Sequence, residues 1–168
     1  MWHDIKMLNA RMSVVAVLLS LAACAAPKLD GDPNTVRIDT PPPGMSVIYL
    51  LRSARDWSTN ASLVHMDDRR VGTTGAGVYY RMEVAPGRHR LAGYAFDQGN
   101  ITLDTQANGV YFVEQHVQGM YNRAQVMHSS NFEVVDEARA REVIANIHTL
   151  PGRQPIGSVT VLPLIPSQ

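Results

Sequence analysis

The stretch SVIYLLR, Ser46–Arg52, decides the fold because it sets five apolar residues in a row, from Val47 to Leu51. An uninterrupted apolar run of this length is typical of a β-strand that is buried on both faces. The segments around it carry the alternating patterns and turn residues of further short strands. We therefore expect a mainly β fold in which this run is a strand covered on each side.

The segment GVYYRMEV, Gly77–Val84, has the clearest alternation in the chain. Successive side chains of a strand point to opposite faces. One face carries Val78, Tyr80, Met82 and Val84, and the other carries Tyr79, Arg81 and Glu83. The pattern predicts that the first face is buried and that the second face is in contact with water.

Three dipeptides with strong turn preferences separate the other strand patterns, namely Asp67-Asp68, Pro86-Gly87 and Asn108-Gly109. Asp and Asn tolerate the left-handed backbone of tight turns, and Pro followed by Gly fits the two central positions of a type II turn. We expect each dipeptide to close a β-hairpin between the strands on either side of it.

Residues 136–149 change to a helical pattern, with apolar residues at the i, i+3, i+4, i+7 spacing of one helix face. These residues are Ala140, Val143, Ile144 and Ile147. Asp136 is expected to cap the N-terminus, and Glu137 precedes Arg141 by the four positions of a helical ion pair. Residues 45–150 are therefore predicted to form an antiparallel β-sandwich or partial barrel with one helix, followed at 151–168 by a tail or an edge strand.

The stretch QGMYNRAQVMHSS, residues 118–130, is expected to be a loop or an irregular excursion. Loops on a rigid sandwich are common recognition sites, and apolar loop residues can anchor partners. Trp57, Met120 and Tyr121 lie in such expected loops and are candidate partner contacts. The alternative is that these side chains fold back onto the core.

Residues 1–23 have the three-part layout of a secretory signal peptide. Lys6 and Arg11 precede the apolar run MSVVAVLLSL, residues 12–21, and small residues follow it. A run of about ten residues is half the length that a membrane-spanning helix needs. The chain's single cysteine, Cys24, comes directly after these small residues.

Leu21-Ala22-Ala23-Cys24 resembles the lipobox of bacterial lipoproteins. The resemblance implies cleavage before Cys24, a diacylglycerol on its thiol and acylation of the new N-terminus, and several acyl chains together give stable anchoring. Apart from this covalent lipid on Cys24, no cofactor is expected. Ala25 rather than Asp follows the cysteine, which favours the outer membrane of the cell envelope. The alternatives are a buried free thiol and a plain signal peptide.

Residues 24–44 are rich in Pro, Asp, Thr and Gly and are expected to form a lipidated tether. The whole chain has 15 basic and 15 acidic residues and therefore no net charge. Nucleic-acid-binding proteins usually carry a basic excess, so nucleic acid is not an expected partner. The expected partners are the lipid bilayer, through the acylated N-terminus, and envelope proteins or cell-wall glycans.

Four segments together resemble a bacterial family of lipoprotein domains of unknown function, DUF2846: VIYLLR, VHMDDRRVG, GVYYRMEVAPGRHRLAGY and GVYFVEQHV. The hairpin pattern is also similar to that of PEGA surface modules. The resemblance covers residues 47–135 and implies an envelope lipoprotein with an immunoglobulin-like or transthyretin-like sandwich, but it implies no activity. Asp68 stands where the first turn of the family usually has Gly, and Trp57 has no place in the pattern.

Catalytic and metal motifs are sparse in this sequence. Glu114 and His116 share a face of the strand VYFVEQHV, and His89 or His65 from neighbouring strands could complete a zinc site. The alternative is a set of polar residues that face water. The sequence GTTGAG, residues 72–77, lacks the Gly-Lys-Ser/Thr ending of a phosphate-binding loop and precedes a strand rather than a helix.

No serine lies in a Gly-x-Ser-x-Gly nucleophile motif. We therefore expect a membrane-anchored, non-enzymatic binding or structural module of the cell envelope. The alternative hypothesis is a metal-binding protein or metal-dependent enzyme of the envelope that uses Glu114 and His116.

Overall fold

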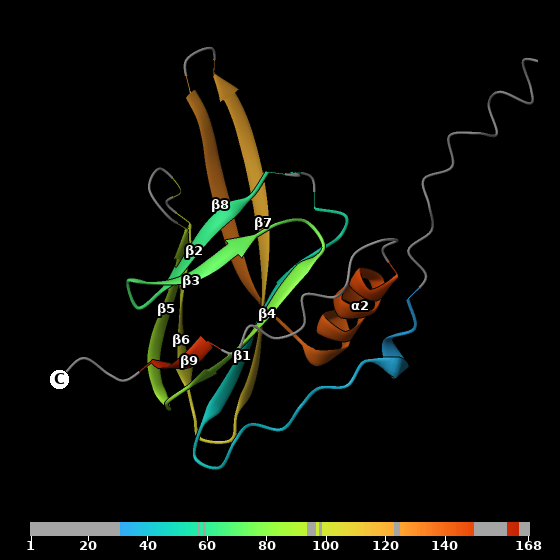
Figure 1. The fold of residues 1–168 in the computed structure, drawn as a ribbon, viewed down its shortest axis with the longest axis vertical. Helices are drawn as coiled ribbons and strands as arrows, with labels where there is room; N and C mark the ends of the chain where they lie inside the picture. Colours follow the sequence, from blue (N-terminus) through green and yellow to red (C-terminus); the bar gives the residue numbers. More distant parts are fainter. Residues whose placement is uncertain are drawn as a thin grey trace, which may run out of the picture.

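Two β-sheets lie face to face, and one helix covers the outer side of the larger sheet (Figure 1). The computed structural model describes residues 31–56, 58, 60–93, 97, 99–122, 125–149 and 161–164, without the side chains of 119–128 and 161–164. This arrangement confirms the prediction of a mainly β sandwich with one C-terminal helix. No helix within the described ranges is long and apolar enough to cross a membrane.

The larger sheet has the strand order β8-β7-β1-β4-β9. Its strands are β1 (Ser46–Arg52), β4 (Val78–Val84), β7 (Val110–Asn122), β8 (Gln125–Val135) and β9 (Val161–Leu164). The smaller sheet has the order β3-β2-β5-β6. Its strands are β2 (Ser62–Met66), β3 (Arg69–Thr74), β5 (Gly87–Gly93) and β6 (Asn100–Thr105). A short 3-10 helix, η2 (Pro33–Thr35), precedes the sheets, and α2 (Glu137–His148) follows β8.

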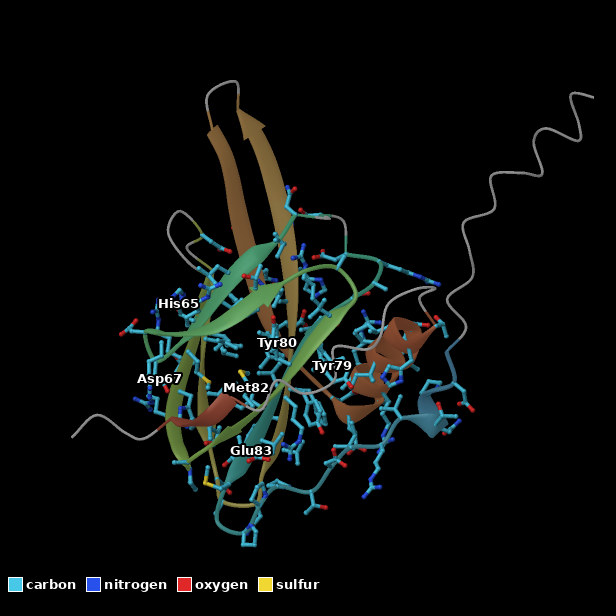
Figure 2. The ribbon with its side chains drawn as sticks, viewed as in Figure 1. His65, Asp67, Tyr79, Tyr80, Met82 and Glu83 are labelled. Carbon is cyan, nitrogen blue, oxygen red and sulfur yellow. The ribbon has the colours of Figure 1, made fainter. Side chains whose placement is uncertain are left out.

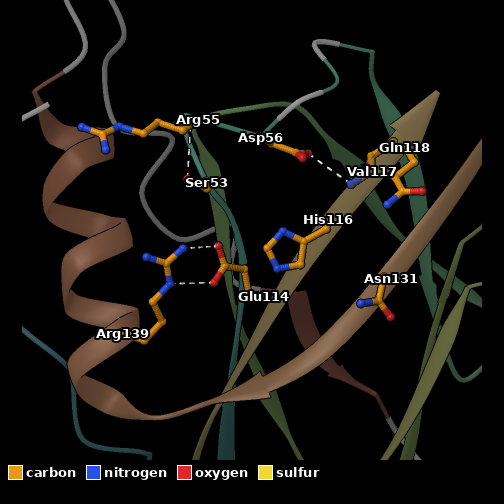
Figure 3. Close-up of a pocket in the computed structure, with 9 residues that line it drawn as sticks. All are labelled: Ser53, Arg55, Asp56, Glu114, His116, Val117, Gln118, Asn131 and Arg139. Atoms are coloured by element: carbon orange, nitrogen blue, oxygen red, sulfur yellow. Dashed lines mark hydrogen bonds and ion pairs between the residues drawn. The ribbon is translucent and has the colours of Figure 1, made fainter. Parts of the chain in front are cut away.

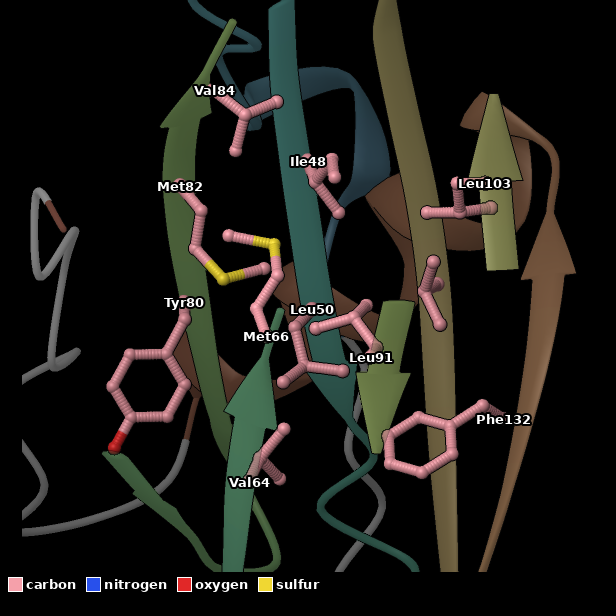
Figure 4. Packing of buried hydrophobic residues seen from close by; sticks show 11 residues of the cluster. Ile48, Leu50, Val64, Met66, Tyr80, Met82, Val84, Leu91, Leu103 and Phe132 are labelled. Atoms are coloured by element: carbon pink, nitrogen blue, oxygen red, sulfur yellow. The ribbon is translucent and has the colours of Figure 1, made fainter. Parts of the chain in front are cut away.

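Strand β1 is buried along its whole length, which confirms the prediction from its apolar run. Ile48 and Leu50 point into the sandwich, where they meet side chains of both sheets (Figure 4). Val47, Tyr49 and Leu51 point the other way and pack in a second cluster with the apolar face of α2. The apolar run therefore lies at the centre of three layers: the helix, the larger sheet and the smaller sheet.

The outer face of β4 is partly covered, with Arg81 buried and Tyr79 and Glu83 half-buried, although the alternation of its sequence predicts contact with water. Tyr80 and Met82 point into the sandwich as expected, whereas Tyr79 points towards α2 and packs in the second cluster (Figure 2). Arg81 is 9% exposed. The prediction failed because polar and aromatic residues on this face have the composition of a solvent-exposed surface. The helix that packs against the face is distant in sequence, so a local pattern does not reveal it.

Of the three predicted hairpins, one is confirmed. Asp67 and Asp68 join β2 to β3 with φ values of 51° and 61°, so Asp68 adopts the left-handed conformation usually given to Gly. Pro86-Gly87 and Asn108-Gly109 instead carry the chain from one sheet to the other. β5 pairs with β2 and β6 rather than with β4, and β7 pairs in parallel with β1.

The expected loop over 118–130 is wrong. β7 and β8 form one long antiparallel hairpin that extends past the other strands, with register pairs running from Phe112–Val135 to Asn122–Gln125 (Figure 1). Met120 and Tyr121 therefore lie in β7, opposite Met127 and Val126 of β8. The prediction failed because the polar residues and Gly119 of this stretch are typical of loops, whereas the structure pairs its backbone in a β-ladder.

Helix α2 follows its sequence pattern closely. Ala140, Val143, Ile144 and Ile147 are all buried against the outer face of the larger sheet. The Asp136 side chain accepts a hydrogen bond from the amide of Arg139 at 2.8 Å, which is the expected N-cap. The Arg141 guanidinium lies 2.7 Å from the Glu137 carboxylate, as the i, i+4 spacing predicts.

Residues 31–44 pack on the domain instead of forming part of a free tether. Val36 is 4% exposed and lies in the cluster with α2. The Arg141 guanidinium donates to the carbonyl oxygen of Val36, and the Tyr49 hydroxyl accepts from the amide of Asp39. The tether predicted over residues 24–44 therefore cannot include its last 14 residues, 31–44.

Candidate functional site

A pocket of about 530 Å³ lies where the segment after β1 and the N-terminal turn of α2 meet the outer faces of β7 and β8 (Figure 3). This volume falls within the range of about 300–1,000 Å³ that is typical of small-molecule sites. Its lining consists of Ser53, Arg55, Asp56, Glu114, His116, Val117, Gln118, Asn131 and Arg139. Val117 is the one aliphatic residue among these, but the exposed surface of the pocket is divided almost equally between polar and apolar atoms.

Strand geometry explains how β7 and β8 contribute to this pocket. Glu114, His116 and Gln118 alternate along β7 and therefore share the face that looks towards α2. Asn131 is the direct cross-strand partner of His116. The prediction that Glu114 and His116 share a strand face is confirmed, and that face borders the pocket.

The wall next to α2 is held by an ion pair between Glu114 and Arg139. The Nε and Nη2 atoms of Arg139 each donate to a different oxygen of the Glu114 carboxylate at 2.9 Å (Figure 3). The side chain of Glu114 is 2% exposed, and that of Arg139 is 40% exposed. The hydrogen bond to Glu114, with a second to Glu142, holds the pKa of Arg139 above its usual value. This bidentate pair fixes α2 to β7.

The opposite wall is held by a buried arginine behind the pocket. The side chain of Arg52 is 0% exposed, and its Nε donates to the Asp56 carboxylate at 2.5 Å. The remaining donors of Arg52 bind the carbonyl oxygens of Ser58, Asn60 and Thr74 at 2.5, 2.8 and 3.1 Å. Asp56 also accepts from the amide of Val117 at 3.2 Å. Arg52 is thus a positioning residue that ties the segment after β1 to β7.

The charges around the pocket compensate one another. Arg52 pairs with Asp56, and Arg139 pairs with both Glu114 and Glu142. Arg55 is exposed at the rim, and Figure 3 shows its guanidinium directed away from His116. The three arginines and three acidic residues sum to zero formal charge.

Three polar side chains without an ionic partner remain available for a ligand. Within the described part of the chain, the side chains of His116, Gln118 and Asn131 have no hydrogen-bond partner. A carboxamide both donates and accepts hydrogen bonds, and an imidazole donates at least one. The arrangement can therefore bind a polar molecule between walls that are already fixed by ion pairs.

The zinc site that the sequence allows does not assemble. Both oxygens of Glu114 accept from Arg139, while His65 and His89 lie on β2 and β5 of the smaller sheet. No group of three or more His, Cys, Asp or Glu residues in the described ranges is arranged to hold a metal ion.

His89 is occupied in another interaction. Its Nδ1 lies 2.7 Å from the Asp67 carboxylate and its Nε2 lies 2.7 Å from the carbonyl oxygen of Ala85. This ring therefore links the β2–β3 turn to the connection between the two sheets.

A second polar cluster lies between the two sheets. The Gln115 amide donates to Ser62 and Ser130 and accepts from Thr74, and the Asp97 carboxylate accepts from Ser130. All five side chains are buried. The cluster satisfies polar groups at one end of the core and offers no open surface to a ligand.

The remaining candidate residues fall outside what the structure describes. Leu21, Ala22, Ala23, Cys24 and Trp57 are not described. The backbones of Met120 and Tyr121 lie in β7, but their side chains are not described. Their proposed contact with partners stays a prediction.

Comparisons with known proteins place most of the folded domain in one family. The family model described as "Protein of unknown function (DUF2846)" matches residues 42–129. A protein of Haemophilus influenzae, named "Uncharacterized protein", is 24% identical over 151 residues, which cover 87% of each chain. No solved structure matches this chain.

Proposed function

This chain belongs to the DUF2846 family, whose function is unknown. From the site itself we propose that it is a lipid-anchored envelope protein that binds a partner non-enzymatically. The pocket between α2 and β7 is the binding site. The observation that carries this proposal is the pairing of the buried charged groups around the pocket, which leaves His116, Gln118 and Asn131 facing the open space.

The two carboxylates that line the pocket are placed to hold its walls rather than to transfer a proton. A general acid or base needs a titratable group free to exchange a proton with a substrate. Glu114 and Asp56 are both held in short ion pairs with arginines, at 2.9 and 2.5 Å. Their carboxylates therefore serve to hold the walls of the pocket in place.

The anchor rests on the lipobox-like sequence that ends at Cys24, and it can be tested in cells. Wild-type protein should incorporate radiolabelled palmitate and partition with the membrane fraction. Cys24→Ser should lose the label and accumulate with its leader uncleaved. A Cys24→Ser protein that is still labelled and processed would contradict the anchor.

The proposed partners are envelope proteins or cell-wall glycans, reached from an outer-membrane anchor. A crosslinking pull-down from intact cells should compare Gln118→Ala/Asn131→Ala with Gln106→Ala, which removes an exposed amide at the turn before β7. Loss of the captured partner from the pocket variant alone supports the proposal. Equal capture by both variants contradicts it.

The metal hypothesis has its own discriminating measurement. Elemental analysis of the purified full-length chain should find no stoichiometric zinc, and a chelator should leave the melting temperature unchanged. Zinc bound in a one-to-one ratio and lost on Glu114→Gln would replace the binding proposal with the metal-dependent alternative.

A further inference from the structure

We propose that the pocket between α2 and β7 binds a neutral sugar ring, through hydrogen bonds from His116, Gln118 and Asn131. This inference rests on the proposed binding function and assigns the chemical class of its ligand. It follows from three properties of the pocket: its charge, the polar character of the side chains that line it and the kind of hydrogen-bonding groups that remain available.

The charge of the pocket argues against an ionic ligand. Each buried carboxylate at the pocket already has an arginine at 2.5–2.9 Å, so an added cation would meet no uncompensated negative charge. An added anion would meet Arg139, which is already neutralised by Glu114 and Glu142, and Arg55 at the rim is directed away from His116 (Figure 3). A neutral ligand leaves both pairs intact and avoids the large free-energy cost of exposing a buried charge without its partner.

The lining argues against an apolar ligand. Most ligand pockets are predominantly apolar with a few polar groups. Here Val117 is the one aliphatic residue in the lining. An apolar molecule would therefore remove the water that solvates the polar lining without replacing its hydrogen bonds, which is unfavourable.

The available groups match hydroxyl groups. A sugar hydroxyl donates one hydrogen bond and accepts others, so its best partners also do both. The carboxamides of Gln118 and Asn131 and the imidazole of His116 have this property. His116 and Asn131 are direct neighbours across two strands, and Gln118 is two residues along β7, so all three lie on one rigid face.

The ion pairs hold the walls beside this face in place before a ligand binds. Glu114–Arg139 fixes α2 against β7, and Arg52–Asp56 fixes the segment after β1 against the amide of Val117. Walls that are already ordered lose less conformational entropy on binding. The spare guanidinium hydrogens of Arg139, whose side chain is 40% exposed, can donate further hydrogen bonds to the same ring.

The test uses the full-length chain, extracted in a zwitterionic detergent without a sugar headgroup. Saturation-transfer NMR would measure the binding of chitobiose, a neutral disaccharide with N-acetyl groups. Its de-acetylated analogue, which is cationic, and inorganic phosphate serve as charged probes. Asn131→Ala and Gln118→Ala remove exposed pocket amides, Gln106→Ala is the matched control, and denaturation midpoints verify that every variant is folded.

We expect saturable transfer to chitobiose, weakened about fivefold or more by each pocket substitution and unchanged by Gln106→Ala. Stronger binding of the cationic analogue or of phosphate would overturn the neutral-ligand assignment. The sugar assignment would also be overturned if all three variants bound chitobiose as the wild type does, or if the wild-type chain did not bind chitobiose. If chitobiose fails while partner capture in cells still depends on Gln118 and Asn131, the binding function stands and the sugar assignment is wrong.

Discussion

The substitution Arg52→Met removes the charge that holds the segment after β1 while keeping an unbranched side chain of similar length. It leaves the Asp56 carboxylate, which is 4% exposed, without its cation. The carbonyl oxygens of Ser58, Asn60 and Thr74 also lose their donors. Because the whole guanidinium is buried, water cannot replace these hydrogen bonds without opening the structure.

Removing one partner of a buried ion pair costs about 3–5 kcal/mol. In a domain of this size each kcal/mol lowers the melting temperature by about 2–4 °C, so Arg52→Met should melt about 6–20 °C below the wild type. Urea denaturation followed by circular dichroism measures the free-energy change directly. Hydrogen exchange should also speed up at the amide of Val117, which donates to Asp56.

Arg88→Met is the matched control, because Arg88 forms the same kind of pair with Asp104 but both side chains are more than 70% exposed. Exposed pairs contribute little to stability, so this variant should unfold at the same urea concentration as the wild type. Equal effects of Arg52→Met and Arg88→Met would refute the assignment of Arg52 as the residue that positions this wall of the pocket.

A double-mutant cycle of Glu114→Gln and Arg139→Met, measured by urea denaturation, should give a coupling energy of about 1–2 kcal/mol. This value is smaller than for a fully buried ion pair because Arg139 is partly exposed. If the effects of the two substitutions are additive, the pair does not link α2 to β7. Asp136→Ala should lower the free energy of unfolding by about 1 kcal/mol through loss of the N-cap, and no change would contradict the cap. Burial raises the pKa of Tyr80 above 10.0, so its contribution to stability is complete below pH 10 and is lost as the pH rises through its folded-state pKa. The free energy of unfolding of Tyr80→Phe should therefore fall less between pH 9 and 12 than that of the wild type. If the two proteins lose stability in parallel over this pH range, ionisation of Tyr80 does not contribute.

Local patterns predicted the elements that depend on neighbours close in sequence. The apolar run Val47–Leu51, the helix stripe and the Asp136 cap are set by residues within a few positions of one another. Their physical causes, burial on two faces and satisfaction of terminal amides, act locally. These features could be read from the sequence and agree with the structure.

Strand pairing was less predictable, because a turn signal specifies a change of direction but not the partner strand. Asn108 adopts φ 64°, as its turn preference predicts, yet the turn leads from the smaller sheet to the larger one. The order of strands depends on which faces bury the most apolar surface. That is decided by contacts between distant segments.

The pocket was half predictable. The alternation of Glu114, His116 and Gln118 along one strand places them on one face, and this can be read from the sequence. Arg139 could not be assigned to Glu114, because the pair joins residues 25 positions apart. Arg52 ends an apolar run and resembles an ordinary strand terminus, so nothing local indicated that it is fully buried.

The most direct test of the account asks which molecule touches the pocket in intact cells. A photo-crosslinker would be placed by Gln118→p-benzoylphenylalanine in β7, with Thr102→p-benzoylphenylalanine on an exposed face of β6 as the control. The account predicts a discrete crosslinked product at position 118 that is absent at position 102 and that a glycan-degrading enzyme removes. No product at 118, or the same product at both positions, would contradict the pocket as the binding site.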